Sequence, residues 1–206
     1  MARAPKPSGR KRPTFESRLG RKTEQRTARQ RLLVVCGAEV TERDYLQGLK
    51  SAVRNPAVSV RIIERPKAPS QVVAHTVKLL QATGDDYDQA WCVLDVDQFT
   101  DLDRAVAEAE RNDVGLALSN PCFELWLLLH FTEHHSHAPT YAHLLPYLDK
   151  HLPGTYSKTD LDFRHYRDTW REAARRARQL APEGAESGTN PATGMWQLAL
   201  AIGGPE

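Results

Sequence analysis

Two aspartates at the end of an apolar segment have the clearest potential for chemistry. Asp95 and Asp97 follow the run 91–94 (WCVL), which predicts a buried strand. Side chains two positions apart on a strand share a face, so both carboxylates would project from the strand's carboxyl end, where open α/β sheets bind ligands. A divalent cation such as Mg²⁺ would relieve the repulsion between them. The alternative is that one aspartate caps a helix and the other is solvated.

Two glutamates in an earlier loop could complete such a site. Glu39 and Glu42 follow a first predicted strand at 31–37. In a parallel sheet, the loops after the first and third strands can meet at one edge, which would bring these glutamates to Asp95 and Asp97. An acidic cluster of this kind could hold Mg²⁺ for phosphodiester cleavage, with a glutamate orienting or deprotonating the attacking water. The alternative is that the glutamates serve only the helix dipole and cap.

Several other chemistries find no support. The chain has no Walker A loop and no G-x-G-x-x-G, so ATP hydrolysis is not expected, and it has no G-x-S-x-G elbow for a serine nucleophile. The histidines in 130–137 lack an HExxH motif, and the three cysteines have no paired spacing, which disfavours zinc. No segment approaches the roughly 18 apolar residues of a membrane span, and the N-terminus lacks a signal-peptide core. A cytoplasmic protein is expected.

Four apolar segments predict strands, and they alternate with segments that predict helices. The predicted strands are 31–37, 58–64, 90–95 and 114–118. Helices are expected at about 41–51, at 70–80 and from 100 or 101. A capping box at 41–44 and Ser70 mark two helix starts, and Gly84 marks a helix end. This order predicts an α/β fold in which a parallel sheet of about four strands is flanked by helices.

The character of the chain changes at Asn120, after which no further strand is expected. Asn120 and Pro121 predict the start of a buried helix through residue 131. Further helices are expected at 140–151, 160–180 and 191–202. The chain would therefore comprise a basic arm at 1–30, an α/β core at 31–118 and an all-helical part at 119–206 packed on that core.

The net charge of +2 conceals a strongly basic N-terminus. Residues 1–30 contain ten Lys or Arg against two Glu, whereas the remaining residues contain 18 basic against 24 acidic side chains. This arm is poor in large apolar residues and is expected to be disordered when free. Its charge favours contact with nucleic acid, and a solubilising tail is the alternative. The candidate nucleic-acid-binding residues are Arg10, Lys11, Arg12, Arg21 and Lys22.

Several segments together resemble the RloB family of prokaryotic Toprim-fold proteins. The most specific is the block 119–131 (SNPCFELWLLLHF). The strand end 91–97 (WCVLDVD), the helix start at 41–45 with its Thr, Glu and Tyr, and the segment 190–193 (NPAT) add to it. The similarity extends in the same order from about Arg31 to Ile202.

The resemblance implies a Toprim-like core and a Mg²⁺-dependent nuclease, with Mn²⁺ as a substitute, that acts on nucleic acid, such as tRNA or other RNA, in defence against phage. It also implies an ABC-type or AAA-type ATPase partner. It leaves the oligomeric state open. Asn120, Glu124 and His130 are expected to pack beside the site as supporting residues.

The resemblance also assigns metal ligands and reveals a departure. Toprim nucleases hold Mg²⁺ with a glutamate after strand one and an Asp-x-Asp after strand three, and Asp95 and Asp97 match the second element. Gly37 stands where relatives have the glutamate, which leaves Glu39 or Glu42 as the acidic partner. The competing hypothesis is a degenerate Toprim-derived subunit that binds nucleic acid or regulates the ATPase.

Overall fold

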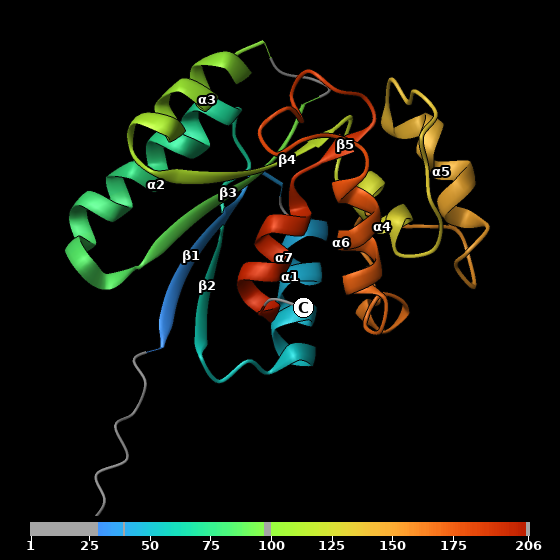
Figure 1. Cartoon of the computed structure of the whole chain (residues 1–206), viewed down its shortest axis with the longest axis horizontal. Coiled ribbons are helices and arrows are strands. Elements are labelled where there is room, and N and C mark those ends of the chain that lie inside the picture. Colours follow the sequence, from blue (N-terminus) through green and yellow to red (C-terminus); the bar gives the residue numbers. More distant parts are fainter. Residues whose placement is uncertain (1–28, 39, 97–99, 205–206) are drawn as a thin grey trace, which may run out of the picture.

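A five-stranded, mostly parallel sheet forms the centre of the molecule in the computed structural model, which describes residues 29–38, 40–96 and 100–204 (Figure 1). The strand order is β2-β1-β3-β4-β5, with the first four strands parallel and β5 antiparallel to β4. The strands are β1 (Gln30–Cys36), β2 (Val58–Glu64), β3 (Gln89–Asp95), β4 (Val114–Asn120) and β5 (Ala192–Thr193).

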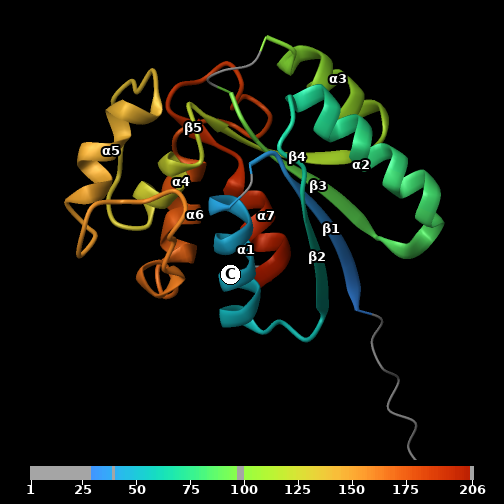
Figure 2. The ribbon, with the colours of Figure 1, turned by 180° about the vertical axis from the view of Figure 1, so that it is seen from behind.

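Helices cover both faces of this sheet, as Figures 1 and 2 show from opposite sides. The α-helices are α1 (Thr41–Val53), α2 (Pro69–Thr83), α3 (Leu102–Arg111), α4 (Glu124–Leu129), α5 (Tyr141–Asp149), α6 (Trp170–Arg178) and α7 (Met195–Gly203), and the 3-10 helices are η1 (Gly84–Asp86) and η2 (Phe163–His165). Within the described ranges, none of these helices has both the length and the apolar character to cross a membrane.

Alternate residues of β1 belong to two different hydrophobic cores. Leu32 and Val34 pack with α1, α4, α6 and α7, whereas Leu33 and Val35 pack with α2 and α3. Because the strand is buried on both faces, its sequence is a continuous apolar run rather than an alternating one. This confirms the predicted α/β class. The sheet also contains β5, which was not predicted, because two residues are too few to show a period.

Three helices predicted in the C-terminal part have different bounds in the structure. The helix expected at 191–202 begins only at Met195, because residues 192–193 form β5. The prediction that a helix starts at Asn120 is wrong, because this residue is the last of β4 and pairs with Ala192 of β5. The single helix expected at 160–180 is also wrong. Asp162 instead accepts a hydrogen bond from the Arg164 N–H and caps the short η2, and α6 begins only at Trp170.

The two predicted N-caps are also wrong, because each residue lies inside its helix and neither makes a side-chain capping hydrogen bond. Thr41 lies inside α1, and its hydroxyl donates to the Lys158 carbonyl at 2.6 Å. Ser70 lies inside α2, where its backbone N–H donates to the Asp101 carboxylate at 3.0 Å. The predicted end of α2 at Gly84 is confirmed, with a positive φ of 56° that favours glycine.

Candidate functional site

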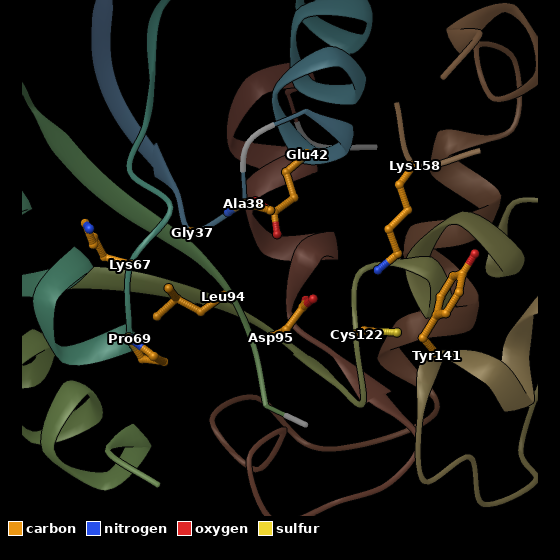
Figure 3. A pocket seen from close by; sticks show the side chains of 10 residues that line it. All are labelled: Gly37, Ala38, Glu42, Lys67, Pro69, Leu94, Asp95, Cys122, Tyr141 and Lys158. Carbon is orange, nitrogen blue, oxygen red and sulfur yellow. The ribbon is translucent and has the colours of Figure 1, made fainter. Parts of the chain in front are cut away.

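A cavity of about 280 Å³ lies at the carboxyl edge of the sheet, where β1 and β3 end side by side (Figure 3). Gly37 and Ala38, which follow β1, line the cavity, and so does Asp95, the last residue of β3. The lining residues are Gly37, Ala38, Glu42, Lys67, Pro69, Leu94, Asp95, Cys122, Tyr141 and Lys158. The cavity therefore combines two carboxylates with two lysine side chains.

Glu42 projects into this cavity from the first turn of α1. Its side chain is almost completely buried, and Oε2 accepts the backbone N–H of Ala38 at 2.9 Å. Burial raises the pKa of Glu42 to about 8; the Ala38 N–H opposes this rise, and the negative charge of Glu124 adds to it. Glu42 can therefore gain or lose a proton near neutral pH, as a general acid or base requires.

Asp95 reaches the same cavity from the end of β3. Its position is fixed because it pairs with Ser119 of β4, and the next residue, Val96, donates its N–H to the Ser119 and Pro121 carbonyls. Figure 3 shows the side chains of Asp95 and Glu42 pointing into the cavity from opposite sides. The structure thus brings together one acid from each of the two loops that the sequence predicted would meet.

The other predicted acids and the five candidate nucleic-acid-binding residues of the basic arm lie outside the described residues. These are Glu39, Asp97, Arg10, Lys11, Arg12, Arg21 and Lys22. Within residues 29–38, 40–96 and 100–204, no group of three or more His, Cys, Asp or Glu side chains is close enough to hold a metal ion. Of the four predicted acids, Glu42 and Asp95 are the two that the described residues place in this cavity.

Gly37 occupies a tight contact between the loop after β1 and the end of β3. Its N–H donates to the Val93 carbonyl at 2.9 Å. A Cβ atom at this position would lie 3.1 Å from that oxygen and 3.1 Å from Cδ2 of Leu94. A side chain at position 37 would therefore require these neighbours to move by a few tenths of an ångström.

Lys158 brings a positive charge to the cavity, and Glu124 holds it there. The buried Glu124 carboxylate lies 3.2 Å from the Lys158 ammonium and accepts the Tyr156 hydroxyl at 3.1 Å. The same ammonium lies 4.2 Å from the ring centre of Tyr141. Burial alone would lower the pKa of Lys158, but the neighbouring Glu124 raises it overall. Lys158 is therefore a fixed cation in the wall of the site.

Comparison with known proteins shows the family of this chain. The family model described as RloB-like protein matches residues 32–202. The chain belongs to the RloB-like family. The match includes every residue that lines the cavity. No curated protein and no solved structure matches the chain.

The other two predicted supporting residues of this RloB-like chain stabilise surrounding elements rather than lining the cavity. Asn120 accepts a hydrogen bond from the Asn190 side chain at 2.8 Å, which links the end of β4 to the segment before β5. His130 is buried, with hydrogen bonds of 3.0 Å to the Tyr45 hydroxyl and 2.9 Å to the Thr169 hydroxyl. Burial lowers the pKa of His130 to about 3, so this imidazole is neutral.

Four lining residues with polar or sulfur-containing side chains were not identified as site residues from the sequence. Lys67, Tyr141 and Lys158 come from loops or helix starts without a motif, and Cys122 was assigned to a helix core. They are brought to the cavity from segments far apart in the chain. The ion pair between Lys158 and Glu124 joins positions 34 residues apart, so a local sequence pattern cannot predict it.

Proposed function

We propose that this RloB-like chain is a metal-dependent phosphodiesterase that cleaves nucleic acid. The supporting observation is that Glu42 and Asp95 share one cavity with Lys67 and Lys158. Carboxylates are suitable ligands for a hard cation, whereas lysine ammonium groups bind phosphate as point charges. A site that contains both suits a substrate with a phosphodiester group better than an uncharged substrate.

The donor set fits Mg²⁺ or Mn²⁺. Proteins commonly hold Mg²⁺ with one or two carboxylates, and water and substrate phosphate supply the remaining oxygens. Asp95 would be the main ligand, with Asp97 from the same segment. The ion, when bound, supplies Lewis-acid stabilisation of the negative charge that develops on the phosphate.

The residues of the chain would divide the remaining work. The raised pKa of Glu42 suits it to accept a proton from the attacking water, a role for which Glu39 is the other candidate. The Ala38 N–H holds Oε2 of Glu42 and so orients the carboxylate. Lys158, fixed by Glu124, would stabilise charge on the substrate phosphate from the opposite wall.

A cleavage assay with purified protein tests this proposal. Labelled tRNA, single-stranded RNA and DNA are incubated with Mg²⁺ or Mn²⁺ and with EDTA. We expect cleavage that EDTA abolishes and added Mg²⁺ restores, and we expect no cleavage by the double variant Asp95→Ala with Asp97→Ala. The matched control is Asp103→Ala with Glu110→Ala, on the exposed side of α3. Cleavage that survives the double variant at Asp95 and Asp97 would refute the proposal.

The biological setting is proposed from the resemblance alone. We infer that the cleavage serves defence against phage in the cytoplasm and that an ABC-type or AAA-type ATPase is the partner. The sequence has no Walker A loop, so this chain is not itself expected to hydrolyse a nucleotide.

A second candidate function is a non-enzymatic subunit that binds nucleic acid or regulates the ATPase. It is favoured by Gly37, which stands where the resemblance places a glutamate, and by Lys158, whose charge partly replaces that of a cation. Repeated turnover by the wild-type protein alone would exclude this candidate. Nucleic-acid cleavage by Gly37→Glu but not by the wild type would favour the non-enzymatic subunit over the nuclease.

A further inference from the structure

A basic groove adjoins the candidate site. This α2 groove has a volume of about 310 Å³ and shares Lys67 with the acidic cavity. It lies along the loop before α2 and the first turns of that helix. Its lining residues are Arg65, Lys67, Gln71, Ala74, His75 and Lys78. The two hollows therefore lie next to each other, one on either side of Lys67.

The described side chains that line the α2 groove carry positive charge. None of its lining residues is acidic, and the sequence of α2 contains no Asp or Glu. Arg65, Lys67 and Lys78 are exposed. Burial and then the nearby positive charges of Arg65 and Lys78 lower the pKa of His75, which lines the same groove. The groove therefore favours a ligand with several negative charges.

The spacing on α2 suits an extended ligand. Gln71, His75 and Lys78 lie four and three positions apart, so they share one side of the helix. From Gln71 to Lys78 the helix rises about 10 Å, which gives the groove length rather than a single point of attachment. Lys67 lines both hollows, and Figure 3 shows it across the cavity from Lys158 and Tyr141, with its side chain directed away from them.

We propose that the sugar–phosphate backbone of a single-stranded nucleic acid lies in the α2 groove and enters the candidate site past Lys67. The inference rests on the proposed function, because it names the substrate on which the cavity would act. Two adjoining hollows of about 310 and 280 Å³ each have the size of a site for one small molecule, such as a nucleotide unit. Lysine and arginine side chains would neutralise its phosphates, and no base needs to be recognised.

Binding of labelled single-stranded RNA and DNA, measured by fluorescence anisotropy in EDTA, tests the inference without cleavage. The test variant is Arg65→Ala with Lys78→Ala, which leaves Lys67 and the cavity intact. We expect affinity to fall about tenfold or more and the slope of log affinity against log salt to weaken by about 1.4, since each lost phosphate contact contributes about 0.7. The basic arm is identical in every variant, so the difference reports on the groove.

The matched control is Arg164→Ala with Arg167→Ala, which removes the same formal charge from exposed positions in η2 and just before α6. Figures 1 and 2 show α6 on the other side of the sheet from α2. We expect it to bind almost like the wild type. An unchanged affinity in Arg65→Ala with Lys78→Ala, or an equal loss in the control, would overturn the inference. Equally tight binding of duplex would also overturn it. Groove-dependent binding without any cleavage would refute the proposed function alone.

Discussion

Glu42→Gln is expected to lower the rate of metal-dependent nucleic-acid cleavage by about 10²- to 10⁴-fold, the usual contribution of a positioned general base. The amide keeps the shape of the side chain and can still accept the Ala38 N–H, but it cannot take a proton from water. Binding of single-stranded RNA in EDTA should be unchanged, because the α2 groove is intact. Single-turnover cleavage measurements at saturating enzyme would isolate the chemical step.

Two comparisons make this prediction specific. Glu110→Gln, an exposed change on α3, should cleave like the wild type. Glu39→Gln tests the other glutamate that the sequence offered as catalytic. If Glu42→Gln cleaves at the wild-type rate and Glu39→Gln does not cleave, then Glu39 is the general base. That result would contradict the role given to Glu42.

The same Glu42→Gln variant is expected to be more stable than the wild type at high pH. Burial raises the pKa of Glu42 to about 8 in the folded protein, whereas in the unfolded chain it returns to its ordinary value near 4.5. Below pH 4.5, Glu42 is protonated in both the folded and the unfolded state, so its ionisation does not lower the free energy of unfolding. As the pH rises from about 4.5 to about 8, the unfolded state releases the proton first, so the free energy of unfolding of the wild type falls.

The difference should reach about 3 kcal/mol at pH 9 relative to pH 5, since each pH unit across this window is worth at most about 1.4 kcal/mol and local relaxation reduces the total. Urea denaturation of both proteins in EDTA, repeated across this range, measures it. Glu110→Gln should follow the wild type within about 0.5 kcal/mol. Parallel stability curves for Glu42→Gln and wild type would show that Glu42 is already ionised when folded.

Opposite effects on rate and stability from one substitution would identify Glu42 as a functional residue. Replacing a residue that only supports the fold lowers the stability of the protein. A carboxyl group that is buried for chemistry instead lowers the stability of the wild type, so replacing it raises that stability. The hydrogen-bonded His130 belongs to the first type, because its replacement would leave the buried hydroxyls of Tyr45 and Thr169 unpaired.

The local pattern of the sequence predicted the parallel sheet and one acid from each loop of the site. Strands buried on both faces produce apolar runs, and the carboxyl ends of adjacent parallel strands must lie at one edge. These two facts predict that Glu42 and Asp95 lie at the same edge of the sheet. The third and fourth predicted acids, Glu39 and Asp97, lie outside the described residues and stay predictions.

Contacts between distant segments account for what the sequence did not predict. The Thr41 hydroxyl bonds to the Lys158 backbone rather than to its own helix end, and β5 exists because it pairs with the end of β4. The α2 groove combines cations from a loop and from one side of a helix, so no run of basic residues marks it in the sequence. Each of these features depends on packing between distant segments, which the spacing of residues along the chain does not predict.

Titration of the protein with Mn²⁺, followed by the electron paramagnetic resonance signal of the free ion, tests most directly whether the acidic cavity is a cation site. We expect the wild type to bind Mn²⁺ and Asp95→Asn to bind it at least about tenfold more weakly, the scale seen when even the partners of metal ligands are changed. Asp103→Asn, on the surface of α3, should bind like the wild type. Equal Mn²⁺ affinity in the wild type and Asp95→Asn would contradict the metal site and, with it, the hydrolytic function.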